Sequence, residues 1–557
     1  MIRRLLLLSC LGLGTFNLSA QNNTSGGFNA GSITGGQLHG DFLLDAQYYV
    51  KDEAINAQEL PQGAGMNAYG NFNYSAGNFK AGMRLESYEP ALLGFDRRYD
   101  QTGVTFRYAQ YFNDQLDITV GNFYEQFGNG LTLRAYWEWY LGLDNNIDGI
   151  RVHYKPIPGI ILKGIIGRQR FYFDQSPGVV RGLDGEFSIN DIFTSLNAAK
   201  TRLIIGGSLV SRYQEDRNST LILPQNVANF AGRINLSRGG FNLNAEYAYK
   251  VNDPSTINQN SYNEGDALLV NASFTGNNFG ASIGMKRWDN MDFRSDRAAT
   301  GFDLFINYQP ALTRQHTYRL SSLYSYPTVP QGEMAFQADI FYNIKRGTLL
   351  GGKYGTNIAI NTSFVNDISR TPSGDSIRNE YQSNFFEIGD DVFYRDVNVE
   401  ITKKVSKKMK FTASVIRQIV NYVFQPATLT GDAIKVKSWI GIVEGTYSYK
   451  VNNKRYTSRL ELQHLSTKQD FGDWFTGLFE QTLTSHWFIN ALGEYNYGNP
   501  NAERRNLYLS GAVGYRKDTY SIKVGGGRQR GGFLCVGGIC RPVPENTGVT
   551  LTLASSF

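Results

Sequence analysis

The chain repeats segments of period-two alternation, joined in turn by a very short connection and by a longer one. In residues 79–86, Phe, Ala, Met and Leu alternate with Lys, Gly, Arg and Glu. Successive side chains of a strand point to opposite faces, so this pattern predicts a strand with one apolar face. The same pattern recurs at 241–250 and 487–497. A soluble sandwich alternates in the same way, so alternation alone does not place the chain in a membrane.

The connections between these segments separate the two classes of protein. The short connections are 75–78, 112–115, 156–159, 237–240, 275–278, 345–347, 450–454 and 516–519, and the long ones include 51–65, 89–102, 126–146, 251–264, 363–392 and 529–547. Short turns at one rim and long loops at the other are typical of a transmembrane β-barrel, with periplasmic turns and extracellular loops.

We therefore predict an all-β chain that forms a single transmembrane antiparallel β-barrel over residues 36–557, with no separate plug domain. The segments give about 26 strands, within a range of roughly 24 to 28, and an even number returns both termini to the periplasm. Two of the expected strands begin at residues 300 and 317. The 60 glycines, 35 phenylalanines and 34 tyrosines suit strands and turns. No apolar run after the amino terminus approaches the ~20 residues of a membrane-spanning helix.

The first twenty residues read as a signal peptide. Arg3 and Arg4 precede an apolar stretch at 5–16, and Leu-Ser-Ala at 18–20 is a small-residue cleavage site. Residues 21–35 would form a short periplasmic segment, which is far too short to be a folded plug.

The carboxy terminus carries a second targeting feature. Residues 548–557 alternate and end on an aromatic side chain. This segment resembles the β-signal of outer-membrane barrels, and the resemblance implies recognition by the barrel-assembly machinery through Val549, Leu551, Leu553 and Phe557.

The two faces of the strands differ in polarity. Only a closed sheet satisfies every backbone polar group in hydrocarbon, so the apolar face must meet lipid. The expected lipid-facing residues include Phe106, Ile118, Val152, Leu209, Ile234, Ile283, Leu460 and Val513, with Tyr88, Tyr249, Trp487, Tyr495 and Tyr515 in the interfacial girdles. The expected lumen-lining residues are Lys80, Arg84, Glu86, Asp117, Lys163, Asp184, Glu186, Arg233, Glu246, Asp339, Lys353, Asp396, Glu400, Arg459, Glu461, Glu494 and Lys523.

Cys535 and Cys540 are the only cysteines beyond the signal peptide. In an oxidising envelope they are expected to form a disulfide that shapes an extracellular, apolar-tipped surface loop. A metal site would need two more ligands, and none is adjacent in sequence. A redox-active pair would favour the tighter CxxC spacing.

The stretch 126–140 is the most aromatic connection of the chain, with Tyr-Trp-Glu-Trp-Tyr at 136–140. Three roles are compatible with it: contact with a sugar or protein, folding into the barrel as a constriction, and stacking at the membrane interface.

Neither catalysis nor a cofactor is expected. The five histidines are scattered, and the GxSxG match at 280–284 falls inside an alternating strand, whereas a nucleophile elbow needs a strand-to-helix turn. A net charge of +6 over this length is too dilute for nucleic-acid binding.

The signal ending at 18–21, the Gly- and Tyr-rich strands and the closing segment Arg-Gly-Gly-Phe-Leu-Cys-Val-Gly-Gly-Ile-Cys-Arg at 530–541 together resemble a family of uncharacterised large outer-membrane barrels from Bacteroidota. The resemblance covers the mature chain and implies place and fold, but it carries no assigned activity. The lipopolysaccharide-export barrel has a comparable strand number, but its soluble periplasmic domain has no counterpart here.

Two functions remain open at this stage. The first is a wide transport or pore barrel in the outer membrane of a Gram-negative bacterium, gated by its own loops or by a partner lid protein. The second is a non-conducting anchor that holds surface lipoproteins or other envelope proteins. Besides outer-membrane lipid, a surface lipoprotein or a lid protein is thus the expected partner.

Overall fold

The computed structural model describes residues 35–557, except 219, 374–377, 423–434 and 538. The predicted signal peptide and nearly all of the short segment that follows it lie outside the described residues.

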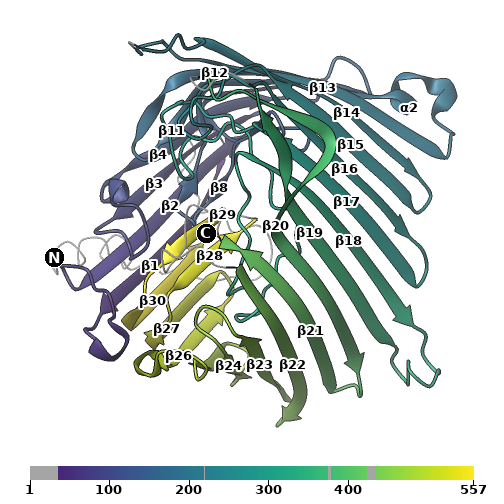
Figure 1. Ribbon diagram of the computed structural model, residues 1–557. Helices are drawn as coiled ribbons and strands as arrows, with labels where there is room; N and C mark the ends of the chain where they lie inside the picture. Colours follow the sequence, from purple (N-terminus) through teal and green to yellow (C-terminus); the bar gives the residue numbers. More distant parts are fainter. Residues whose placement is uncertain (1–34, 219, 374–377, 423–434, 538) are drawn as a thin grey trace.

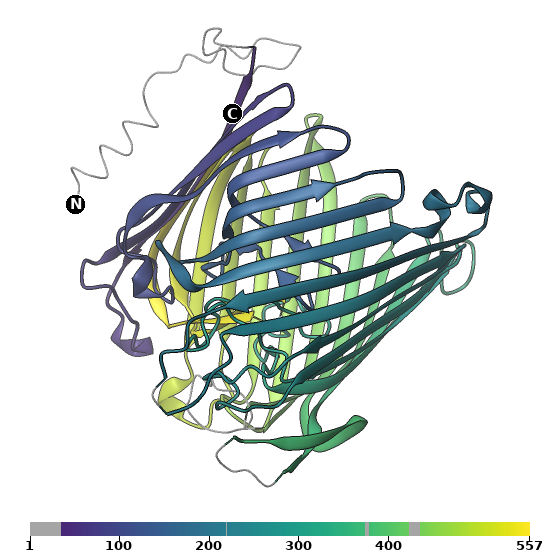
Figure 2. The ribbon, with the colours of Figure 1, turned by 90° about the horizontal axis from the view of Figure 1, so that it is seen from above.

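The fold is one large antiparallel sheet of 24 strands. Figures 1 and 2 show that the sheet curves round into a barrel. The wall strands are β1 (Gln37–Tyr49), β2 (Ala64–Ala76), β3 (Phe79–Tyr88), β4 (Thr102–Phe112), β5 (Leu116–Phe123), β10 (Ile147–Tyr154), β11 (Ile160–Phe171), β12 (Asp174–Ser188), β13 (Thr201–Tyr213), β14 (Asn226–Arg238), β15 (Phe241–Lys250), β16 (Gly265–Thr275), β17 (Phe279–Asp289), β18 (Gly332–Ile344), β19 (Thr356–Pro372), β20 (Tyr381–Lys404), β21 (Met409–Asn421), β22 (Lys435–Val451), β23 (Lys454–Thr467), β24 (Trp474–Thr482), β25 (Trp487–Tyr495), β26 (Leu507–Lys517), β27 (Tyr520–Gln529) and β30 (Asn546–Ser556).

The shorter elements lie in the connections. They are β6 (Gln126–Phe127), β7 (Leu133–Arg134), β8 (Trp137–Glu138), β9 (Leu143–Asp144), β28 (Gly532–Val536), β29 (Ile539–Val543), the helix α2 (Ile189–Ile192), and the 3-10 turns η1 (Glu53–Ile55), η2 (Arg97–Tyr99), η3 (Thr194–Leu196) and η5 (Ala502–Arg504). No described helix has the length and hydropathy needed to cross a membrane.

The first and last strands close the wall. β1 pairs with β30, from Asp41 opposite Ser556 to Tyr49 opposite Gly548. Every other wall strand pairs with its neighbours in chain order. The prediction of a single closed antiparallel barrel is therefore confirmed, and 24 strands lie at the lower end of the expected range.

The expected strands at 300 and 317 do not exist in the wall. After β17 the chain leaves the sheet at residue 290, and it returns only at β18. The intervening residues fold inside the barrel, where Arg294 and Phe305 form an isolated antiparallel bridge and other backbone groups bond to other loops and to wall side chains instead of to a wall strand.

The apolar alternation marks the outer face of the wall. Leu183, Ile283 and Val513 are 63%, 63% and 47% exposed. By contrast, the inward neighbours of these residues are largely covered. An outward band of apolar side chains around a closed sheet is the surface of an outer-membrane-type barrel.

Two of the expected outward aromatic residues instead point into the barrel. The register between β3 and β4 shifts at Arg84 and Leu85, as in a β-bulge, which changes which residues of β4 face outward. Phe106 consequently stacks on Tyr124, with ring centroids 5.1 Å apart. Tyr88 is 2% exposed and donates a hydrogen bond to Glu86, so it belongs to the interior and not to a girdle.

Candidate functional site

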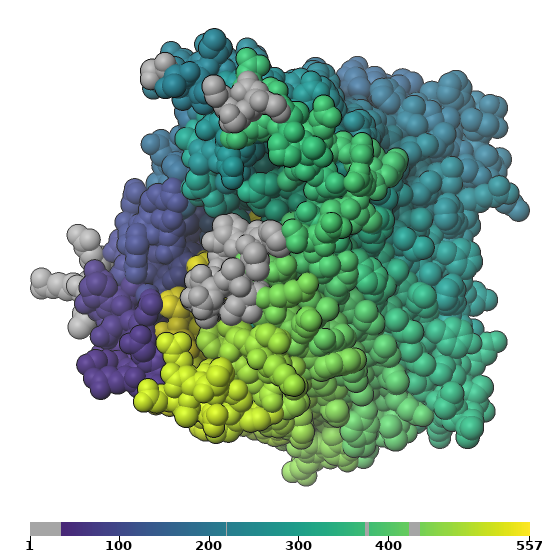
Figure 3. All heavy atoms as spheres, viewed as in Figure 1, coloured from purple at the N-terminus to yellow at the C-terminus, as the bar shows by residue number. Residues whose placement is uncertain are grey.

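Three connections fold into the barrel and make its interior the candidate site. They are the internal segment (residues 290–331, between β17 and β18), the aromatic loop (124–146, between β5 and β10) and the cysteine hairpin (530–545, which contains β28 and β29). Figures 1 and 2 show these parts within the wall, towards the rim that carries the long loops. Figure 3 shows that this face of the molecule is hollowed between the purple amino-terminal strands and the green strands.

The aromatic loop packs against the inner wall. Phe127, Leu131 and Leu133 are fully buried. A side chain at Gly182 on β12 would lie only 2.8 Å from the ring of Phe127, so glycine leaves room for this contact. The backbone amide of Asn129 donates to Glu246 over 2.7 Å. Of the three roles left open by the sequence, folding into the barrel is the one observed.

A buried ionic network ties the same loop to the wall. Arg84 and Arg170 of the wall both bind Glu86, with distances of 2.7 Å, and both also bind Asp144 of the aromatic loop. The guanidinium of Arg84 further lies 4.0 Å from the ring of Trp137. Two cations and two carboxylates balance each other, as buried charges must.

The first half of the internal segment binds the aromatic loop and the strands beside it. Asn307 donates to the backbone oxygen of Leu131 over 2.8 Å. Arg212 of β13 donates to the backbone oxygen of Arg294 over 3.0 Å. The apolar residues of this first half, including Phe293 and Ile306, complete the buried cluster around Phe127.

The second half of the internal segment reaches the opposite part of the wall and binds its carboxylates. Four side chains of this half pair with acidic residues of β20, β22 and β25. The pairs are Arg314 with Glu400 at 3.2 Å, His316 with Asp396 at 2.9 Å, Tyr318 with Glu444 at 3.2 Å, and Arg319 with Glu494 at 2.5 Å. Burial and the Glu444 carboxylate raise the pKa of Tyr318, so its hydroxyl stays a neutral donor.

Apolar contacts hold the same half against the wall. Leu320, Tyr324 and Tyr326 are buried in a cluster with inward residues of β21 to β24, such as Ile416 and Ile440. Burying a side chain of this size contributes roughly 1.5–3 kcal/mol. The internal segment is thus docked on both sides of the lumen and crosses it.

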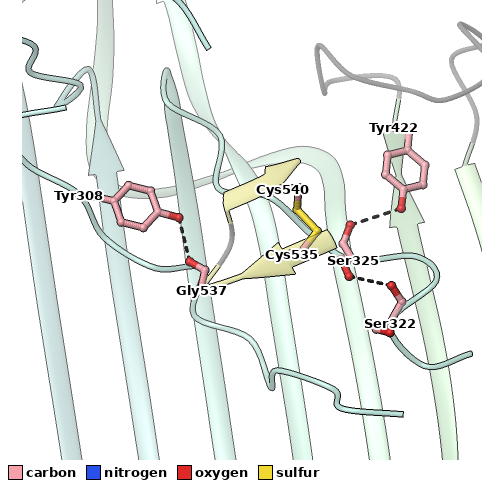
Figure 4. Close-up of a disulfide and its surroundings, with 7 residues drawn as sticks. All are labelled: Tyr308, Ser322, Ser325, Tyr422, Cys535, Gly537 and Cys540. Atoms are coloured by element: carbon pink, nitrogen blue, oxygen red, sulfur yellow. Dashed lines mark hydrogen bonds between the residues drawn. A yellow bond between two sulfur atoms is a disulfide. The ribbon is translucent and has the colours of Figure 1, made fainter. Parts of the chain in front are cut away.

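The cysteine hairpin packs against the internal segment (Figure 4). Cys535 and Cys540 form the predicted disulfide across the β28–β29 pair. The hydroxyl of Tyr308 donates to the backbone oxygen of Gly537 over 2.8 Å, and Arg530 binds Glu494 over 2.9 Å. Burial lowers the pKa of Arg541 to about 10.

The place of the hairpin differs from the expected surface loop. Ile539 is 1% and Cys540 6% exposed, and the hairpin shares a cluster with Leu141 and Phe305. Its apolar tip is buried by the two other internal parts, which the sequence could not show because they are distant in the chain.

Several of the charged residues that were expected in the lumen bind one another or other side chains along the inner wall. Arg233 binds Asp184 at 2.7 Å and Glu186 at 3.4 Å. Arg459 contacts Glu461 and two further carboxylates, those of Glu444 and Glu480. Asp339 accepts from Asn361 at 2.6 Å. Lys80 lies 4.8 Å from the ring of Phe112.

Two of the remaining expected residues also have partners inside the barrel. Asp117 binds Arg151 of the wall, and Lys163 binds Glu125 of the aromatic loop. Lys523 stands opposite Gly514 in the β26–β27 register. Lys353 is an exception, because it lies in the turn between β18 and β19, outside the wall strands.

The residues of the internal segment that bind the wall were not identified from the sequence. Arg314, His316 and Arg319 stood in a stretch that was interpreted as strand. Three prolines in the same stretch, Pro310, Pro327 and Pro330, gave a signal against that interpretation, because proline removes a ladder hydrogen bond.

The described part of the interior carries charges of both signs, and the internal segment and the cysteine hairpin lie among them. In the part of the chain that the structure describes, no group of three or more His, Cys, Asp or Glu side chains is placed to hold a metal ion.

Several solved structures are similar to this chain at very low sequence identity. The siderophore receptor PirA from Pseudomonas aeruginosa is 11% identical, with a TM-score of 0.38 over 93% of this chain and 80% of that one. The translocation pore of the P pilus usher PapC is 8% identical, with a TM-score of 0.40 over 93% and 99%. OpdL from Pseudomonas aeruginosa is 10% identical, with a TM-score of 0.35 over 79% and 95%.

No curated protein matches the sequence significantly. A family model does match, and it extends over residues 3–557, so it takes in the closed wall, the internal segment and the cysteine hairpin together. A match of this length leaves no part of the barrel outside it, and the chain belongs to the family of unknown function DUF6029.

Proposed function

We propose that this protein is a transport barrel of the outer membrane whose channel is restricted by its own internal segment and cysteine hairpin. The observation that carries the proposal is the course of the internal segment, which crosses the lumen and binds carboxylates on β20, β22 and β25. A barrel of 24 strands is wide enough to need such filling, because ~16 strands already leave an aqueous channel.

The contacts of the internal segment suit a restriction that loosens locally. Its second half is anchored by the apolar cluster around Leu320, Tyr324 and Tyr326, and ion pairs with the wall lie beside this anchor. The side chains of Arg314 and Arg319 are 29% and 42% exposed, so water reaches these two pairs. A solute that competes for Glu400 or Glu494 would therefore loosen these contacts while the apolar cluster keeps the segment in the lumen.

Conductance in planar bilayers tests this proposal. We expect small or infrequent current steps for the wild-type protein and larger or more frequent steps when the contacts to the wall are weakened, as in Asp396→Asn with Glu494→Gln. A correctly assembled barrel that passes no ions in either form would contradict transport and would favour the anchoring role for surface lipoproteins. The proposal includes no catalytic step.

The orientation is part of the same proposal. β1 begins and β30 ends at the rim of the short turns, so both termini would be periplasmic and the long loops extracellular. Single-chain barrels of bacterial outer membranes have this arrangement, and the resemblance to Bacteroidota barrels implies such an origin. Single cysteines test it: a membrane-impermeant maleimide should label Glu503→Cys on whole cells but not Lys407→Cys. Labelling of Lys407→Cys alone would show that the topology is the reverse of the one proposed.

A further inference from the structure

The lipid-facing band ends differently at its two edges. At the edge near the short turns the outward residues are mainly aromatic, and Tyr111, Tyr342 and Trp487 are 46%, 47% and 45% exposed. At the edge near the long loops, arginines take the corresponding outward positions on several strands. They are Arg168 of β11, Arg181 of β12, Arg395 of β20 and Arg417 of β21.

Arg395 and Arg417 are neighbours on the outer face. Arg417 stands opposite Val397, which is 43% exposed, and Arg395 stands two residues further along the same strand. Diagonal neighbours on one face of a sheet are roughly 7–8 Å apart. Lys437 of β22 stands opposite Ile419 and adds an exposed third cation.

Both guanidinium groups are held in place by the wall itself. Arg417 lies 5.2 Å from the ring of Trp439 and donates to the backbone oxygen of Ser438 over 3.1 Å. Arg395 lies 5.2 Å from the ring of Phe364 and donates to the backbone oxygen of Val365 over 3.1 Å. Each guanidinium has five N–H donors, so most of them remain for another acceptor.

Among the described residues, no ion pair joins Arg395, Arg417 or Lys437 to a carboxylate. Two other outward arginines differ in this respect, since Arg107 binds Asp148 and Arg528 binds Asp52. Three cations thus meet at the edge of an apolar surface without an acidic partner among the described residues. Charged side chains on the outer face of a barrel are tolerated near the membrane interface, but they are costly at the centre of the bilayer.

We propose that Arg395, Arg417 and Lys437 bind the phosphorylated headgroup of a lipid in the leaflet that faces the long loops. Arginine forks match phosphate oxygens, which gives strong charge-assisted hydrogen bonds. Val397, Val415 and Val443 continue the same face towards the short turns and are 43%, 55% and 54% exposed, so acyl chains have an apolar surface to lie on. This apolar surface favours a lipid over a free anion. The inference does not depend on whether the lumen conducts.

The test uses the full-length protein in detergent and diphosphorylated lipid A as the probe. Binding is measured by native mass spectrometry for the wild type, for Arg395→Gln with Arg417→Gln, and for Arg238→Gln as the matched control, an exposed arginine at the end of β14 near the short turns. Heat-modifiable migration shows whether each variant is folded. Dephosphorylated lipid A and inorganic phosphate are tested beside the probe.

We expect the double variant to bind diphosphorylated lipid A at least ~10-fold more weakly, with Arg238→Gln unchanged, and dephosphorylated lipid A to bind weakly to all three proteins. Equal binding by a folded double variant would overturn the proposal. So would equal binding of dephosphorylated lipid A, or full displacement of the lipid by millimolar inorganic phosphate, which would indicate a site for free phosphate. If the double variant does not fold, the single variants Arg395→Lys and Arg417→Lys take its place, because they keep the charge but lose the fork. Each should bind diphosphorylated lipid A more weakly than the wild type, and wild-type binding by both would overturn the proposal.

Discussion

Arg319 of the internal segment binds Glu494 of β25 through an Nη2–Oε2 distance of 2.5 Å. The other oxygen of the same carboxylate accepts from Arg530 of the cysteine hairpin over 2.9 Å, and Arg530 also donates to the backbone oxygen of Arg319 over 3.1 Å. The Glu494 carboxylate of the wall therefore binds both the internal segment and the cysteine hairpin, and it holds these two parts together.

Glu494→Gln should loosen both internal parts while leaving the wall intact. The amide keeps the size of the carboxylate but loses its charge, so two guanidinium groups lose their common ionic partner. We expect larger or more frequent current steps in planar bilayers than for the wild type. Glu186→Gln is the control, because Glu186 pairs with Arg233 of the wall. Identical conductance of all three proteins would show that this contact does not restrict the channel.

The outward face of the wall should not tolerate charge at mid-depth. Ile283→Arg and Val513→Arg place a guanidinium among lipid tails, at a cost of ~2–4 kcal/mol for each. Lys80→Ala, on the inner face, should assemble normally. Heat-modifiable migration after expression in outer membranes measures the folded fraction, and equal fractions for the three variants would mean that the faces are inverted.

The wall could be predicted from the sequence because its rule is local. Each strand shows its own alternation, and the alternation of short and long connections fixes their order. Phe106 shows the limit of this rule. One bulge between β3 and β4 changes which residues of β4 face outward, and no neighbouring residue in the sequence indicates the bulge. Alternation also cannot say which partner a segment pairs with, and the stretch from 300 alternates while it packs against other loops.

The candidate site could be predicted only in part. Luminal charges such as Glu86, Asp184 and Glu494 follow from the inward face of the strands. Arg319 and Arg530, the partners of Glu494, come from connections that are distant in the chain, so this part of the network depends on how the loops fold inwards. The prolines of the internal segment were the one local sign of that folding.

The end of the β1–β30 seam near the long loops should weaken in acid. Asp52 accepts hydrogen bonds from Arg528 over 2.6 Å and from Thr547 over 3.0 Å. Burial works to raise the pKa of Asp52, but these hydrogen bonds outweigh it and leave the pKa below its ordinary value. A carboxyl whose pKa is lower in the folded state stabilises that state above its ordinary pKa, and the contribution is lost as the pH falls.

We therefore expect protease cleavage within residues 50–63 to increase as the pH falls below ~4, the ordinary value for aspartate. An acid-stable protease such as pepsin makes the measurement feasible. Asp52→Asn should be cleaved faster than the wild type at pH 5 and should gain little on further acidification. Glu53→Gln, whose residue pairs with Lys51 in solvent, is the control. Equal pH profiles for the wild type and Asp52→Asn would remove the role of this carboxyl.

The disulfide should hold the cysteine hairpin in shape without supporting the wall. Cys535 and Cys540 close a short loop, so the stabilisation should be at the lower end of ~2–4 kcal/mol, and the ladder between β27 and β30 does not pass through the hairpin. Cys535→Ser with Cys540→Ser should keep heat-modifiable folding. It should also raise conductance, because the hairpin places Gly537 against Tyr308 and Arg530 against Glu494.

Maleimide should label the wild-type protein only after reduction. In Cys535→Ser the remaining Cys540 thiol should react slowly in the folded protein, since that residue is 6% exposed, and rapidly after unfolding. Free thiols without reductant would contradict the bond, and rapid labelling of folded Cys535→Ser would contradict the buried position of the hairpin.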